Sequence, residues 1–243
     1  MSTMPASLEL EKHGGGGGGR VPPGRGGDGG SGARGDGAPD FRERLNRYRL
    51  GMAIGLIGVI MVFVSLTSAY IVRQGTTTRD PNTGIEAVDW LPITLPTSAL
   101  VLNTLLLLAS SVALELARRS LKRQYAVAEA VGDSEAQAPA PWLAVSVLLG
   151  AGFLAGQLFV WSELRRRGVY LPTNPSSSFF YLLTALHGVH LLGGMIALGY
   201  AQATAWLHRS IAQRLLVVDV TGIYWHFMAL LWLYIFGLFQ FVK

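Results

Sequence analysis

The sequence predicts an all-α integral membrane protein with five transmembrane helices. Half of its 243 residues are hydrophobic, only 14% are charged, and the mean hydropathy is +0.37. A helix that crosses a bilayer needs roughly 20 apolar residues, and the chain contains five such stretches, at residues 50–72, 94–117, 142–162, 178–206 and 215–241. They lack the alternation of barrel strands, and a backbone inside a membrane must satisfy its own hydrogen bonds, so we expect helices.

Two further segments precede the first span. Residues 1–40 contain 14 of the 30 glycines and few apolar side chains, which predicts a disordered, glycine-rich tail. Residues 41–49 are basic and amphipathic and are expected at the headgroup surface of the membrane. The membrane domain is therefore expected to occupy residues 41–243.

The basic residues are concentrated on one side of the predicted membrane. The tail and the second and fourth connections hold 14 of the 20 Lys and Arg residues, and the other side holds six. The positive-inside rule then places the N-terminus in the cytoplasm and the C-terminus outside. Because these charges lie beside membrane ends and not in a soluble domain, nucleic acid is not an expected partner. Cysteine is absent, which excludes disulfides and thiolate metal sites.

A few polar residues are predicted deep within the spans, where a polar side chain costs free energy and so marks a candidate site. They are Asn103, Gln157, His187, His190 and His226. The three histidines are expected to approach one another near the midplane of the membrane. Neutral imidazole can bind a metal or haem, but two histidines one turn apart on one helix cannot hold a haem from both faces. Hydrogen bonding between helices is the preferred interpretation.

The carboxylates of the spans are expected at the membrane boundaries, with none well buried. Glu115 stands beside Arg118 and Arg119 at the spacing of helical salt bridges, and Asp219 is expected to reach the inner interface. A proton pathway needs titratable groups within the membrane, so this pattern disfavours a pump or transporter.

Small residues recur at helix-packing spacing. Gly51 and Gly55 lie in the first span, and Gly152 and Gly156 lie in the third. Such pairs let neighbouring backbones approach closely, which predicts a compact bundle or a docking face.

Several motifs together resemble subunit III of cytochrome c oxidase, a member of the haem-copper oxidase subunit III family. The most specific are Tyr-Trp-His-Phe at residues 224–227, Trp-Leu-Tyr at 232–234 and Thr-Ala-Leu-His-Gly-Val-His at 184–190. Further matching residues are Phe179, Phe180 and Tyr181; Leu102, Asn103 and Thr104; Ser110 and Ser111; and Gly152, Phe153 and Gln157. The resemblance covers residues 41–243.

The resemblance implies the five-helix bacterial form of this subunit, with two helix bundles and a cleft that holds phospholipid. It implies direct packing on oxidase subunit I, with subunit II in the same complex of the bacterial inner membrane. Haem and copper are expected in the partners, and no catalytic centre or cofactor other than lipid is expected in this chain. The matching positions implied to make structural or lipid contacts are Asn103, Gln157, His187, His190, Trp225 and His226.

Two departures from the family pattern disfavour a direct proton relay in this chain. Val59 stands where many relatives have a glutamate, and Met228 and Ala229 stand where many have an aspartate. Two alternative functions stay open at this point. One is subunit III of a quinol oxidase or nitric oxide reductase system, and the other is a stand-alone transporter or a histidine-metal membrane protein.

Overall fold

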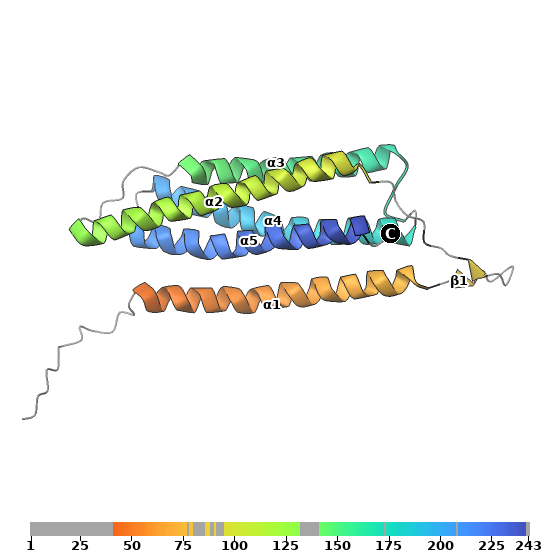
Figure 1. The fold of residues 1–243 in the computed structure, drawn as a ribbon, viewed down its shortest axis with the longest axis horizontal. Coiled ribbons are helices and arrows are strands. Elements are labelled where there is room, and N and C mark those ends of the chain that lie inside the picture. The colour runs from red at the N-terminus through yellow and green to blue at the C-terminus, as the bar shows by residue number, and fades with distance from the viewer. Residues whose placement is uncertain are drawn as a thin grey trace, which may run out of the picture. The chain divides into compact units, whose positions relative to one another are not determined.

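The computed structural model contains five long helices. It describes residues 41–76, 78–79, 86–87, 90, 95–131, 141–172, 174–207 and 209–241. The helices are α1 (Phe41–Gln74), α2 (Thr97–Val131), α3 (Pro141–Arg166), α4 (Pro175–Trp206) and α5 (Ile211–Phe241) (Figure 1). Each is long and apolar enough to cross a membrane, so the predicted five-span helical membrane protein is confirmed. The predicted tail, residues 1–40, lies outside the described residues.

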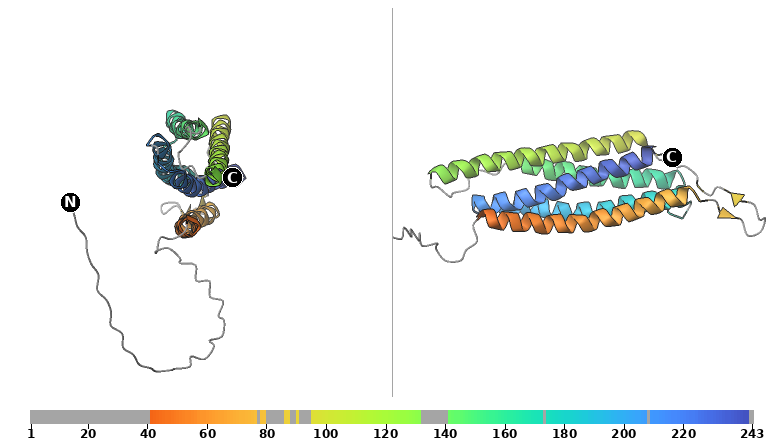
Figure 2. Two further views of the ribbon diagram at one scale, coloured as in Figure 1. Left: turned by 90° about the vertical axis from the view of Figure 1, so that its left-hand side faces the viewer. Right: turned by 60° about the horizontal axis from the view of Figure 1, so that its bottom comes forward.

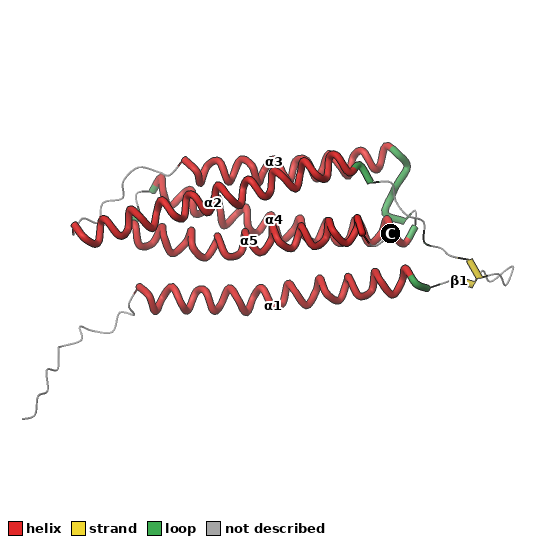
Figure 3. Tube along the Cα trace, viewed as in Figure 1, coloured by secondary structure: helices red, strands yellow, loops and turns green. Residues whose placement is uncertain are grey.

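The helices extend beyond the apolar stretches that predicted them. Residues 41–49 form the first turns of α1 and not a separate segment, and α2 continues past residue 117 to Val131 (Figure 3). Hydropathy marks only the part of a helix that is in lipid, whereas Arg, Ala, Glu and Lys sustain helix outside it. Two short strands, β1 (Thr78–Arg79) and β2 (Glu86–Ala87), pair antiparallel after α1.

Four of the helices form one group and α1 lies beside it. Helix α2 packs on α3 and α5, and α4 packs on α3 and α5, whereas among the described helices α1 contacts only α4 and α5. Figure 2 shows the four-helix group end-on with α1 along one side. The resemblance implied two bundles with a cleft between them; here a single helix stands apart from a group of four. We call the end at which α1 and α5 begin the N-terminal end of the bundle.

Trp225 is the central side chain of the four-helix group. It is fully buried, and its indole lies against the backbones of α3 and α4: a Cβ added to Gly150 or Gly194 would lie 2.8 Å or 3.0 Å from the ring. Its Nε1 donates a hydrogen bond to Ser110 Oγ on α2 at 3.1 Å. One residue of α5 therefore contacts all three other helices of the group.

The paired glycines behave differently in the two helices that carry them. On α3, a Cβ at Gly156 would overlap the side chain of Asn103, so this glycine permits the predicted close approach of α2. On α1, a Cβ at Gly51 or Gly55 would meet nothing within 4 Å. The α1 glycines thus make no close helix contact within the part of the chain that is described.

Candidate functional site

A cluster of charged side chains joins three helices at the N-terminal end of the bundle. Its centre is Asp219 on α5, whose side chain is only 1% exposed. Arg49 from α1 reaches its Oδ2 with Nη2 at 2.7 Å, and Arg118 from α2 donates from Nε to Oδ1 at 2.8 Å. Lys122 Nζ lies 3.7 Å from the same Oδ1. The expectation that no carboxylate is well buried is wrong, because cations from two other helices neutralise Asp219 inside the bundle.

Glu115 extends this cluster toward the middle of the membrane domain. It accepts hydrogen bonds from Arg118 at 3.0 Å and from Arg119 at 2.9 Å, which confirms the salt bridges predicted from spacing. Its Oε2 also lies 3.7 Å from His226 Nε2, and the other ring nitrogen of His226 is hydrogen-bonded to Ser111 Oγ. Polar contacts between α2 and α5 therefore continue from Asp219 to His226, about 10 Å along α5 at 1.5 Å per residue.

The three histidines of the last two helices point at different neighbours. His187 packs against Trp232 with ring centroids 5.3 Å apart, inside the four-helix group. His190 packs against Phe63 of α1 at 5.9 Å, and its Nδ1 lies 2.8 Å from the carbonyl oxygen of Leu186 on its own helix. His226 faces α2. The expected meeting of the three rings does not occur, and nowhere in the described ranges do three or more His, Asp or Glu side chains form a group that could hold a metal ion.

The remaining candidates from the sequence lie in the interior. Asn103, Gln157 and His187 are all buried, and Asn103 Nδ2, both amide atoms of Gln157 and both ring nitrogens of His187 have no hydrogen-bond partner among the described residues. Trp225 instead makes the bond to Ser110 described above. Direct bonds between helices are therefore found for Trp225 and His226, while His190 bonds within its own helix.

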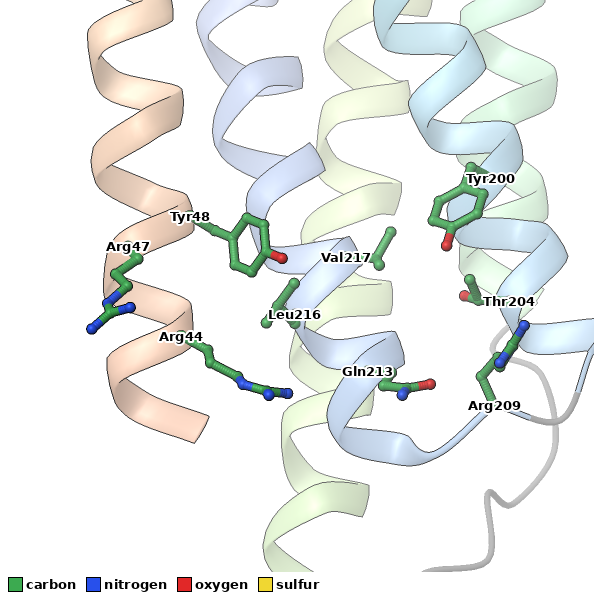
Figure 4. A pocket seen from close by; sticks show the side chains of 9 residues that line it. All are labelled: Arg44, Arg47, Tyr48, Tyr200, Thr204, Arg209, Gln213, Leu216 and Val217. Carbon is green, nitrogen blue, oxygen red and sulfur yellow. The ribbon is translucent and has the colours of Figure 1, made fainter. Parts of the chain in front are cut away.

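A pocket of about 700 Å³ opens at the N-terminal end, between α1 on one side and α4 and α5 on the other (Figure 4). Its lining combines three arginines with tyrosines and aliphatic side chains. The residues are Arg44, Arg47 and Tyr48 of α1, Tyr200 and Thr204 of α4, Arg209, and Gln213, Leu216 and Val217 of α5. Guanidinium groups bind phosphate through paired hydrogen bonds, so the pocket is suited to an anionic amphiphile.

This pocket was not predicted from the sequence. The positions of the arginines along the chain indicate which side of the membrane they occupy, but not how far apart they lie in the folded protein. The available signal was that Arg44, Arg47 and Arg209 are all assigned to the same side of the membrane. Only the packing of α1 along α4 and α5 brings them to one pocket.

These features define a class of protein: a multi-pass helical membrane protein in which ion pairs and hydrogen bonds join neighbouring helices. The comparison with known families makes the class specific. The family model for cytochrome c oxidase subunit III matches residues 40–242, so the chain belongs to that family. The resemblance inferred from the Tyr-Trp-His-Phe and His-Gly-Val-His motifs is confirmed.

Individual relatives agree with this assignment. The chain is 28% identical over 201 residues to cytochrome c oxidase subunit 3 of Thermostichus vulcanus, which covers 82% of this chain and 87% of the relative. It is 26% identical to the probable cytochrome c oxidase subunit 3 of Mycobacterium leprae, over 83% of this chain and 91% of the relative. The subunit 3 of Bacillus sp. (strain PS3) is 28% identical over 80% of this chain and 84% of the relative.

Replacement of Asp219 by Asn tests the ion cluster. The substitution leaves Arg49, Arg118 and Lys122 facing a neutral group, so we expect the free energy of unfolding to fall by roughly 3 kcal/mol. This value is at the lower end of the range for broken buried ion pairs, because the arginine side chains are partly exposed. The matched control is Glu43→Gln, whose carboxylate lies 3.9 Å from Arg47 with both side chains mostly exposed. That control should change the unfolding free energy by less than about 0.5 kcal/mol. Thermal unfolding in detergent measures both; equal effects would show that the cluster contributes no more than a surface pair.

Proposed function

We propose that this chain is the noncatalytic subunit III of a terminal cytochrome c oxidase of a bacterial inner membrane. In this role it packs against subunit I, with subunit II in the same complex, while the complex reduces oxygen and translocates protons. The observation that carries the proposal is the family match, which extends over residues 40–242 and so includes all five helices. The same match disfavours a stand-alone transporter or metal protein.

The histidines that the structure describes do not form a site that fits haem or copper. The ligands that proteins use for these groups are chiefly imidazole and thiolate, and the sequence contains no cysteine. His187, His190 and His226 contact Trp232, Phe63 and Ser111 respectively, and so lie in three different environments. Haem and copper are accordingly assigned to the partner subunits, and no step of the oxygen chemistry is assigned to this chain.

The chain is instead built to hold its own helices in fixed positions. Ion pairs join α1, α2 and α5 at Asp219, and hydrogen bonds from Trp225 and Trp232 join α5 to α2. A hydrogen bond between membrane helices contributes only about 0.6 kcal/mol on average, since separated groups find other partners, so the helices are held by several such contacts together. Such a rigid scaffold can support a neighbouring subunit through its shape and its bound lipid.

The pocket between α1 and α4 supports the proposed binding of phospholipid. Arg44 and Arg209 supply guanidinium groups for the phosphate of a headgroup, whereas Arg47 is turned away from the pocket (Figure 4). Leu216 and Val217 of the lining supply apolar contacts for acyl chains. By the positive-inside rule this end faces the cytoplasm, so the lipid would belong to the cytoplasmic leaflet.

Affinity purification tests the proposed complex. A tagged version of the full chain, extracted in mild detergent, should carry a haem-copper subunit and a dicopper subunit with it, and the preparation should oxidise reduced cytochrome c. Absorption spectra and mass spectrometry measure the partners. Recovery of the chain alone would contradict membership of an oxidase, whereas a complex that oxidises quinol but not cytochrome c would contradict only the electron donor.

Removal of two pocket charges tests the lipid site. In the Arg44→Gln/Arg209→Gln variant we expect at least a several-fold loss of anionic phospholipid that copurifies with the complex, because each arginine contributes charge-assisted hydrogen bonds to phosphate. Lipid extracts analysed by mass spectrometry give the amount per complex. The matched control, Arg165→Gln/Arg166→Gln, removes two exposed charges from the C-terminal end of α3, at the end of the bundle away from the pocket. A loss that is equal in the two double variants would show that the pocket has no special affinity.

A further inference from the structure

Five polar atoms without a protein partner lie in the interior of the four-helix group. They are Asn103 Nδ2 on α2, Gln157 Oε1 and Nε2 on α3, and His187 Nδ1 and Nε2 on α4. Each of these residues is at least nine-tenths buried, with exposed fractions of 3%, 5% and 1%. Three helices thus each contribute an amide or imidazole to the interior, and none of the five atoms is bonded to another described residue.

The three side chains lie at one level of the four-helix group. His187 packs on Trp232 at 5.3 Å and on Phe153 at 6.2 Å, and those two rings lie 4.9 Å apart. Gln157 follows Phe153 by one turn of α3, on the same buried face. The side chain of Asn103 lies against the backbone of α3 at Gly156, the residue before Gln157, since a Cβ built on Gly156 would overlap its amide. The unpartnered groups therefore share one layer of the bundle.

Physical chemistry requires that such groups have partners. Buried polar atoms in folded proteins are almost always hydrogen-bonded to protein or to ordered water, and each exception costs at least as much as a hydrogen bond contributes. Acyl chains outside the bundle offer no donors or acceptors. Five unsatisfied atoms in one layer would oppose folding strongly, so a ligand with both donor and acceptor capacity is needed there.

The chemistry of the groups selects water over a cation. A neutral imidazole and a glutamine amide each offer both a donor and an acceptor, and the asparagine contributes a donor. A metal cation is disfavoured because His187 is the single strong metal ligand of the three groups, and the carboxylates Glu115, Glu163 and Asp219 are paired with arginines elsewhere. We propose that Asn103, Gln157 and His187 bind ordered water inside the four-helix group, beside Trp232 and Phe153.

This hydration site differs from the ion cluster and from the lipid pocket, and it does not depend on either. The ion cluster lies between α1, α2 and α5, whereas the three residues proposed to bind water lie on α2, α3 and α4. Water that bridges three helices fixes their relative rotation, because each hydrogen bond constrains the direction of a side chain.

A density map of the purified complex tests the site directly. In a map that resolves ordered water, we expect density about 3 Å from His187 Nδ1 or Nε2 and from the amide of Gln157, the usual hydrogen-bond distance. Two results would overturn the proposal. One is an interior without water density, and the other is a set of side chains that bond directly to one another.

Substitution provides an independent test in the intact complex. If water links the groups, Gln157→Met or His187→Phe alone should lower the thermal midpoint of the subunit by roughly 2–4 °C or more, since the remaining groups lose a partner. The thermal midpoint of the Asn103→Leu/Gln157→Met/His187→Phe variant should then fall by less than the sum of the decreases in the three single variants. Single variants that each raise the midpoint would show a dry interior and overturn the proposal.

A matched control separates the water network from general disturbance of α4. His190 lies one turn from His187, but it bonds its own helix and contacts α1. The effects of His190→Phe and Gln157→Met should therefore add, whereas those of His187→Phe and Gln157→Met should not. If both double variants depart equally from the sum of their single effects, the evidence for a water ligand shared by His187 and Gln157 is lost. If a single variant does not fold, the triple variant and the density map still decide.

Discussion

The structure depends on one buried carboxylate and the cations that neutralise it. Asp219 lies within a helix that is apolar enough to cross a membrane, where an unpaired charge would be very costly. Arg49 and Arg118 approach it from α1 and α2. Because α1 contacts only α4 and α5 among the described helices, and many of its apolar side chains are exposed, this charge pair is a major constraint on where α1 lies. The position of α1 in turn creates the arginine-lined pocket.

Hydropathy alone was sufficient to predict the number and type of the long helices. The physical reason is that a span is a local property: roughly 20 consecutive apolar residues and an internally bonded backbone define it. Helix ends were less predictable, since α2 continues through Arg118, Lys122 and Arg123 to Val131 on helix propensity and not on hydropathy. The salt bridges of Glu115 were predictable for the same local reason, because three- and four-residue spacing places side chains together on one helix.

The burial of Asp219 was not predictable from local sequence. Its partners are separated from it by 170 and 101 residues, and no local pattern indicates which cations of other helices will reach it. The same limit explains the histidines. Their spacing placed His187 and His190 near each other, but the direction of each ring depends on neighbouring helices, Trp232 and Phe153 for one and Phe63 for the other. The motifs identified the family more reliably than they identified contacts.

Spin-label distances between α1 and α5 test the central claim, that the Arg49–Asp219 pair fixes α1 against the other helices. The chain has no cysteine, so single cysteines introduced at the exposed positions Ile57 and Leu230 would carry the only labels on it. We predict one narrow distance distribution in the otherwise unaltered protein and a broader or longer one in Arg49→Gln. A distribution that is unchanged by Arg49→Gln would contradict the account, since α1 would then be held by apolar packing alone.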